Sequence, residues 1–305
     1  MAERPRQVRR SPGRGGRTAG LVGVVLGALV LVGLAWGIRS IADSAGVGKD
    51  DAAVQTTPTT ATAPTGPILK IVFPEGFTRK EMAARIAAVN EIALEKRDVK
   101  TRLSPKAYLR LTEQGALPRD FAKAKVPHLE GFLFPATYTF TKNTTTRGLV
   151  TMQLDAFTNA WESVDLKYAK SKNLNAYDVL IIASMVEKEV QVPKERPLVA
   201  AVIYNRLKAG IKLGIDATIR YGLDIPPTQA ILESQLHSDS PYNTRERLGL
   251  TPTPIANPGL ASIQAAAHPA KVDYLFFIRK PDCRSHFFTA SQEEFDNYSR
   301  EGLNC

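Results

Sequence analysis

The sequence has few residues of the kinds that bind metals or form reactive centres. Its 305 residues include two cysteines and four histidines. These do not fall at the spacing of a metal site, so we expect no metal and no other cofactor. No nucleophile-elbow motif surrounds Ser184 or Ser240, which argues against a serine hydrolase. Cys283 and Cys305 are either joined in a disulfide or are two unrelated thiols, and the sequence is compatible with both.

Charged residues are absent from Thr18 to Ile38. This run is long enough to cross a bilayer as a helix. It follows an arginine-rich segment, which the positive-inside rule keeps in the cytoplasm. A cleavable signal peptide is the alternative, although the apolar run is longer than the core of such a peptide. We expect a basic cytoplasmic tail at residues 1–17 and a single transmembrane helix at residues 18–40, with the rest of the chain outside the cytoplasm.

Acidic residues are outnumbered, with 30 against 40 basic ones, which gives a net charge of +10. More than half of this excess lies in six arginines before the apolar run: Arg4, Arg6, Arg9, Arg10, Arg14 and Arg17. An excess confined to a tail does not indicate a nucleic-acid-binding domain. We therefore expect no nucleic-acid partner.

The rest of the chain divides into a linker and two folded parts. Residues 41–67 are rich in Thr, Pro and Ala and hold no apolar pattern, so they are predicted to be a disordered linker. Residues 68–128 open with an alternating strand and a helix whose capping box is Thr78 and Glu81, which predicts a small α/β subdomain. Residues 129–305 are predicted to form a mixed helical and β catalytic domain, and the fold class is α+β.

Within the larger part, hydrophobic periodicity predicts helices, a hairpin and a long loop. The expected helices cover residues 145–161, 175–190, 195–209 and a short stretch ending at 267, with a last helix capped by Ser291 and Glu294. The segment from 211 to 222 is expected to be strand-like or turn-rich, residues 240–259 to be an ordered loop, and residues 274–279 and 285–289 to pair as a hairpin.

The helix predicted over residues 175–190 carries two glutamates near its C-terminal end. Its apolar stripe includes Glu189 and places Glu187 on the other, exposed face. Residues two apart are about 200° apart around a helix, so these two carboxyls cannot work as a pair. Burial and the negative end of the helix dipole both raise the pKa of a carboxyl at such a position, which is how a general acid is made. A solvated helix end with Glu189 at the edge of the stripe is the alternative.

Several motifs occur in an order that resembles the endolytic murein transglycosylase (YceG-like) family over roughly residues 68–298. They are Leu129-Glu-Gly-Phe-Leu-Phe-Pro-Ala-Thr-Tyr, Ala183-Ser-Met-Val-Glu-Lys-Glu, Val202-Ile-Tyr-Asn-Arg-Leu, Asp216-Ala-Thr-Ile-Arg-Tyr-Gly, Tyr242-Asn-Thr, Pro254-Ile-Ala-Asn-Pro-Gly, Ala265-Ala-Ala-His-Pro-Ala and Tyr274-Leu-Phe-Phe with His286-Phe-Phe. Two departures accompany the resemblance. Ala136 stands where the family commonly has Asp, and only one small segment, at most a partial LysM-like module, precedes residue 129.

The resemblance implies a lytic transglycosylase in the bacterial cell membrane, with its catalytic domain outside. Such an enzyme cuts nascent peptidoglycan strands between N-acetylmuramic acid (MurNAc) and N-acetylglucosamine (GlcNAc) and leaves 1,6-anhydroMurNAc ends, which would terminate strand elongation. Its catalytic glutamate corresponds to Glu189. Peptidoglycan strands and cell-wall synthases are the implied partners. A catalytically silent peptidoglycan-binding scaffold for synthesis enzymes is the alternative function.

Candidate substrate-binding residues come from the loops and from the aromatic motif, which is Leu129-Glu-Gly-Phe-Leu-Phe-Pro-Ala-Thr-Tyr138. They are Asp216, Tyr242, Asn243, Asn257 and Tyr138. Polar groups could stabilise an oxocarbenium-like sugar, and an aromatic ring could stack on it. Each also has a structural explanation, namely a turn residue, loop-stabilising hydrogen bonds, a conformation imposed by the following proline, or core packing.

Overall fold

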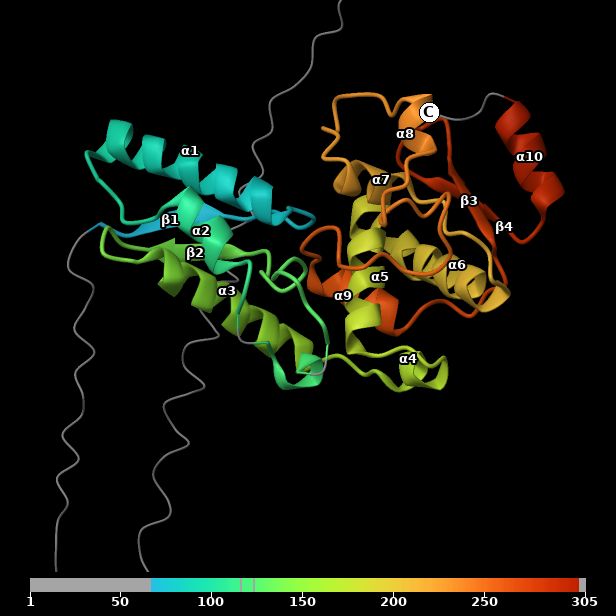
Figure 1. Ribbon diagram of the computed structural model, residues 1–305, viewed down its shortest axis with the longest axis horizontal. Helices are drawn as coiled ribbons and strands as arrows, with labels where there is room; N and C mark the ends of the chain where they lie inside the picture. The colour runs from blue at the N-terminus through green and yellow to red at the C-terminus, as the bar shows by residue number, and fades with distance from the viewer. Residues whose placement is uncertain (1–66, 116, 123, 302–305) are drawn as a thin grey trace, which may run out of the picture. The chain divides into compact units, whose positions relative to one another are not determined.

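The computed structural model describes residues 67–115, 117–122 and 124–301 (Figure 1). The predicted tail at 1–17, the predicted transmembrane helix at 18–40 and all but the last residue of the predicted linker lie outside these residues. In the described ranges, no helix has both the length and the apolar character that crossing a membrane requires. The described chain is an α+β fold with short strands.

A two-stranded antiparallel sheet opens the described part of the chain. Strand β1 (Leu69–Val72) pairs with β2 (Thr137–Phe140), and Ile71 lies opposite Tyr138. Alternate residues point inward and are buried, while the others are exposed, as expected for a sheet with one covered face. The boundary predicted at residue 129 therefore falls between the two strands of one sheet.

Three helices gather around this sheet: α1 (Arg79–Arg97), α2 (Pro105–Leu111) and α3 (Thr146–Trp161) (Figure 1). The predicted capping box at the start of α1 is confirmed. The Thr78 side chain accepts from the backbone N–H of Glu81, and the Glu81 carboxylate accepts from the backbone N–H of Thr78 at 2.7 Å. A short 3₁₀ helix, η1 (Arg119–Phe121), follows α2 and places Phe121 against aromatic rings of the core.

Helix α5 (Ala176–Glu189) lies at the centre of the C-terminal half (Figure 1). The Asn175 side chain caps its N-terminus by accepting from the N–H groups of Tyr177 and Asp178. The helix packs against α6 (Arg196–Ala209), α7 (Asp216–Gly222) and α9 (Leu260–Ala267). All six residues from 181 to 186 are buried, so α5 is covered on more than one face.

Shorter elements connect these helices. They are α4 (Lys167–Ser171), η2 (Pro193–Glu195) and α8 (Glu233–Leu236). Helix α6 ends at Gly210, whose left-handed φ of 65° is the conformation that favours glycine at a helix C-terminus.

The segment predicted to be strand-like or turn-rich is a helix, α7 (Asp216–Gly222), so that prediction was wrong. Its β-branched residues are held helical by tertiary contacts that the local sequence does not show. The buried Thr218 hydroxyl donates to the Ile215 carbonyl at 2.6 Å and lies 3.0 Å from the Thr244 hydroxyl. Thr244 also accepts from the Ile215 N–H at 3.0 Å.

The predicted C-terminal hairpin and last helix are confirmed. Strand β3 (Phe276–Arg279) pairs antiparallel with β4 (His286–Thr289), and α10 (Gln292–Arg300) begins after the Ser291 cap. Cys283, in the hairpin turn, is disulfide-bonded. Cys305 lies outside the described residues.

Candidate active site at the end of the central helix

Glu189 is the last residue of α5 and is partly buried. Burial raises the pKa of its carboxyl to about 7, and the nearby negative charge of Asp216 acts in the same direction. The positive charges of Arg279 and Arg245 and a hydrogen bond from the Ala217 N–H partly oppose this rise. A carboxyl with this pKa is about half protonated at pH 7, so a large share of the molecules can donate a proton there.

Asp216 is the first residue of α7, and its carboxylate forms an ion pair with Arg245 near Glu189. Both Nε and Nη2 of Arg245 lie 2.7 Å from the same oxygen, Oδ1, of Asp216. The two side chains are each close to half exposed. The ion pair therefore holds Asp216 in place and offsets much of the negative charge that it presents to Glu189.

Glu187 is not the exposed neighbour that the helical pattern predicts. Its side chain is only 7% exposed. It accepts from the backbone N–H of Gly259 at 3.0 Å and lies 4.0 Å from an Arg196 nitrogen. The prediction failed because a second helix, α9, and the loop before it cover this face of α5. Ser184 on the same face is also buried and accepts from the Ile255 N–H at 3.0 Å.

Two of the predicted binding residues stabilise the loop after α7. The Asn243 side chain is fully buried and donates to the carbonyls of Leu236 and Ser238 at 2.9 and 2.8 Å. The Tyr242 hydroxyl lies 2.9 Å from the Thr253 hydroxyl, and its ring packs on Tyr221. The contacts of both side chains therefore fit the explanation that they stabilise the loop through hydrogen bonds and packing.

Asn257 and Tyr138 are likewise buried with their polar atoms hydrogen-bonded inside the protein. Asn257 Oδ1 accepts from the N–H groups of Gly131 and Leu133 at 2.8 and 3.0 Å. The Tyr138 hydroxyl donates to the Phe134 carbonyl at 2.7 Å, and burial raises its pKa. Of the five predicted binding residues, Asp216 is the one whose charge acts on Glu189.

A second carboxyl with a raised pKa, Glu130, escaped the sequence analysis. It is 2% exposed, and burial raises its pKa to about 7. It accepts from the Arg79 N–H at 3.0 Å, from the Asn257 amide at 2.7 Å and from the Tyr221 hydroxyl at 3.2 Å. Its position within an otherwise apolar motif was the available signal. Because its oxygens are enclosed by protein donors, Glu130 stabilises the fold at the start of α1.

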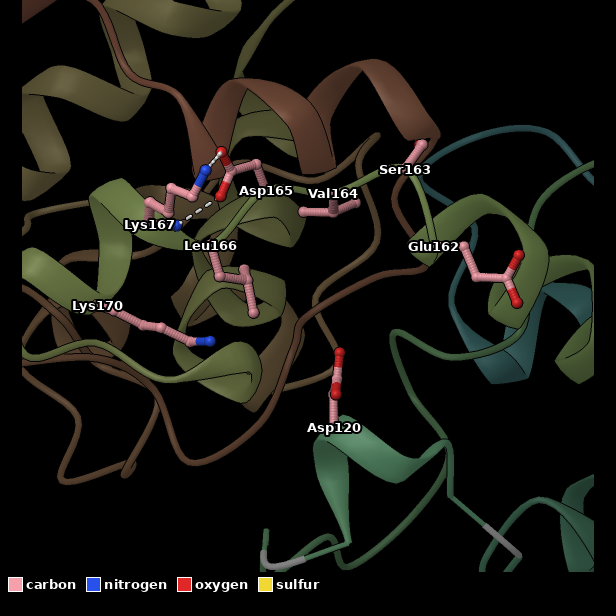
Figure 2. A pocket seen from close by; sticks show the side chains of 8 residues that line it. All are labelled: Asp120, Glu162, Ser163, Val164, Asp165, Leu166, Lys167 and Lys170. Carbon is pink, nitrogen blue, oxygen red and sulfur yellow. Dashed lines mark hydrogen bonds and ion pairs between the residues drawn. The ribbon is translucent and has the colours of Figure 1, made fainter.

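A hollow of about 390 Å³ lies at the other end of α5 (Figure 2). In this view Asp120, Leu166 and Lys170 point into it, and Lys167 pairs with Asp165 at 3.7 Å. An adjoining hollow reaches Asn175, the cap of α5. The helix is roughly 20 Å long at 1.5 Å per residue, so these hollows are well separated from Glu189.

The arrangement around Glu189 provides one proton donor near the Asp216–Arg245 ion pair and the positive charge of Arg279. Among the residues that the structure describes, no group of three or more His, Cys, Asp or Glu side chains could hold a metal ion. The chemistry that this geometry supports is general acid catalysis by a single carboxyl.

Comparisons with known proteins agree on one family. Residues 52–301 match the YceG-like family. An endolytic murein transglycosylase of Bacillus subtilis (strain 168) is 34% identical over 220 residues, which are 71% of this chain and 60% of that protein. One of Streptococcus pneumoniae (strain ATCC BAA-255 / R6) is 30% identical over 264 residues, 79% of this chain and 46% of that protein. The chain thus spans about half to three fifths of the length of these relatives.

A solved structure shows the same relationship. The crystal structure of a YceG-like protein from Listeria monocytogenes superposes with a TM-score of 0.63 at 29% identity and covers 76% of each chain. Since the family match extends over more than half of the sequence, the chain belongs to the YceG-like family.

Proposed function

We propose that this protein is an endolytic peptidoglycan lytic transglycosylase with Glu189 as its catalytic acid. The observation that supports the proposal most strongly is a carboxyl with a pKa of about 7 at the end of the central helix of a YceG-like fold. Two relatives that carry the name endolytic murein transglycosylase share at least 30% of their aligned residues with this chain.

A single carboxyl is enough for this reaction. Glycosidases that hydrolyse the glycosidic bond with water use a second carboxylate, either as nucleophile or to activate the water. In a lytic transglycosylase the substrate supplies the nucleophile, which is the C6 hydroxyl of MurNAc. Protonated Glu189 gives its proton to the glycosidic oxygen as the bond from MurNAc C1 to that oxygen breaks. The resulting carboxylate takes the proton of the C6 hydroxyl as O6 bonds to C1.

The environment of Glu189 suits both halves of this cycle. A pKa of about 7 keeps the carboxyl protonated for the first half and leaves it basic enough for the second. The Asp216 carboxylate, held in place by Arg245, helps to raise the pKa of Glu189 and so favours its protonated form.

The cellular setting is also part of the proposal. Residues 18–40 would anchor the protein in the bacterial cell membrane with its N-terminus in the cytoplasm, and the catalytic part would face the cell wall. There it would cut new glycan strands beside cell-wall synthases and so terminate their elongation.

The test compares two variants of the same helix. Full-length wild type, Glu189→Gln and Glu187→Gln proteins are incubated with purified peptidoglycan, and 1,6-anhydromuropeptides are measured by mass spectrometry. Glu189→Gln should lose product by about a hundredfold to ten-thousandfold, because no proton remains to be donated. Glu187→Gln should retain activity, since a glutamine oxygen can still accept from the Gly259 N–H.

Circular dichroism of both variants establishes that the fold is intact. Wild-type protein that binds peptidoglycan without releasing anhydromuropeptides would contradict the proposal and indicate a silent scaffold. Full activity in Glu189→Gln would refute Glu189 as the acid while leaving the enzyme class in place.

A further inference from the structure

The β3–β4 hairpin is fixed to the start of α6 by a buried pair. Glu195 Oε1 accepts from the His286 backbone N–H at 3.2 Å, and Glu195 Oε2 lies 2.8 Å from His286 Nδ1. A carboxylate can only accept, so Nδ1 carries the proton in this contact. The side chains of His286 and Glu195 are 1% and 6% exposed. Movement of the hairpin would strip these buried polar groups of their partners, which is costly.

Two further side chains of α6 hold the segment that leads into β3. Asn205 Nδ2 donates to the carbonyls of Val272 and Tyr274 at 3.0 and 2.9 Å. Arg206 Nε donates to the Leu275 carbonyl at 2.5 Å, and its Nη1 donates to the Leu213 carbonyl at 2.7 Å. Arg206 therefore ties β3 to the segment that precedes Asp216.

Arg279, at the end of β3, is held in place by these contacts between the hairpin and α6. In the hairpin register it lies directly opposite His286, so the buried pair sets the place of its backbone. Across the part of the chain that the structure describes, its guanidinium makes no hydrogen bond and no ion pair within 4 Å. Residues directly opposite each other in an antiparallel pair project to the same face of the sheet, so Arg279 lies on the face that His286 presents to Glu195, six residues after Glu189. From there its positive charge lowers the pKa of the Glu189 carboxyl. Its five N–H donors are thus not used to hold the fold together.

The other charged groups around Glu189 are committed to partners. Asp216 is bound by Arg245 through two donors on one oxygen. The guanidinium of Arg206 is bound by backbone carbonyls, and burial lowers its pKa. Arg279 is therefore the cation beside Glu189 that can respond to a change of charge on that carboxyl.

We propose that Arg279 is a positioning residue of the transglycosylase reaction, held beside Glu189 by the hairpin to stabilise the carboxylate left after proton donation. The inference rests on the proposed function. When the proton moves to the glycosidic oxygen, Glu189 becomes negative in a partly buried site. Arg279 is already in place, so this negative charge is stabilised without rearrangement, and the carboxylate then takes the C6 hydroxyl proton.

The first test is the pH dependence of the reaction. The full-length Arg279→Gln, Arg279→Lys and Arg284→Gln proteins are assayed for anhydromuropeptide release from pH 5 to 9. Arg284 is exposed in the turn of the same hairpin, so its variant makes the same charge change away from Glu189. In Arg279→Gln the limb that falls at high pH should move up by about 0.5–1 pH unit, because loss of the cation makes Glu189 hold its proton more tightly.

The rate at the optimum in Arg279→Gln should fall by about tenfold, equivalent to about 1.4 kcal/mol of transition-state stabilisation. Arg279→Lys should restore the limb and most of the rate, and Arg284→Gln should match the wild type. A slower Arg279→Gln enzyme whose pH limb has not moved would mean that Arg279 acts only through structure, which would overturn the inference.

The second test does not depend on activity. The Glu189 carboxyl carbon is titrated by ¹³C NMR in the wild type and the three variants, with Glu189→Gln used to assign the signal. The midpoint should rise in Arg279→Gln and stay unchanged in Arg284→Gln. An unchanged midpoint in Arg279→Gln overturns the inference. If the wild type releases no anhydromuropeptide, the proposed function fails, and the NMR midpoint alone decides whether Arg279 controls the charge of Glu189.

Discussion

Asn257 Nδ2 donates to Glu130 Oε1 at 2.7 Å, and both side chains are buried. The same amide donates to the Phe77 carbonyl at 2.8 Å, and its oxygen accepts from Gly131 and Leu133. Three segments far apart in the sequence therefore meet at one asparagine: the entry to α1, the aromatic motif and the loop before α9.

Replacement of Asn257 by alanine should destabilise the protein severely. It would leave the N–H groups of Gly131 and Leu133 without a partner inside the protein and would remove one of the two hydrogen bonds to Glu130 Oε1. Each such group costs about 1–3 kcal/mol, so we expect a loss of about 2–4 kcal/mol after partial relaxation. Urea unfolding measures this loss, and Asn143→Ala at an exposed position is the control. Equal midpoints for the two variants would contradict the structural importance of Asn257.

Glu130 should make folding stability depend on pH. Its folded pKa of about 7 lies above the ordinary value of 4.5, so the folded state binds the proton more tightly than the unfolded state. Its contribution is then full below about pH 4.5 and is lost as the pH rises through about 7, by on the order of 2–3 kcal/mol.

The Glu130→Gln variant isolates this contribution. A glutamine oxygen can still accept from Arg79 and Asn257, and its amide can donate to the Tyr221 hydroxyl. The decrease in unfolding free energy between pH 5 and 8 should therefore be smaller in Glu130→Gln than in the wild type. Denaturant unfolding across this range provides the measurement, and an identical slope in both proteins would show that Glu130 is not the cause.

Gly131 and Gly249 form a matched pair for testing the packing of the aromatic motif. Both have left-handed φ values, 92° and 86°, so alanine at either position carries a similar backbone strain of about 1–2 kcal/mol. A Cβ on Gly131 would lie 2.6 Å from a Pro254 ring carbon, whereas one on Gly249 would meet nothing within 4 Å. Gly131→Ala should therefore lower the melting temperature well beyond Gly249→Ala, and similar losses would argue against this close packing.

The proposed transglycosylase reaction should slow as the pH rises through about 7. Glu189 must carry a proton to act as the acid, and its pKa is raised to about 7. Above that value the protonated fraction, and with it kcat/KM, should fall about tenfold per pH unit. Initial rates of anhydromuropeptide release in buffers of constant ionic strength check this. A rate that keeps rising beyond pH 8 would exclude Glu189 as the proton donor.

Local signals in the sequence were sufficient to place most elements. The Thr78 and Asn175 caps are formed by side chains within three residues of the groups they bind, so they could be recognised from the sequence alone. Helix α7 was missed because its Thr218 hydroxyl is satisfied by Thr244, a contact that no local pattern reports.

The candidate site was predictable only in part, for a similar reason. The apolar stripe indicated Glu189, and its raised pKa agrees with that interpretation. The same stripe wrongly predicted that Glu187 is exposed. An amphipathic pattern assumes that one face of the helix meets solvent, whereas α5 is covered on more than one face. The role proposed for Arg279 could not be predicted, because its position is set by a hairpin anchored through Glu195 and His286, which are distant from each other in the sequence.

The pairing of β1 with β2 also constrains how the chain can mature. Ile71 leaves the ribosome long before Tyr138, its partner across the sheet, so the first strand has no neighbour until most of the aromatic motif has been translated. A protease that removed everything before residue 129 would strip β2 of its partner and Glu130 of the Arg79 N–H. The N-terminal segment is therefore not a detachable accessory, and its loss should release the remaining polypeptide to degradation.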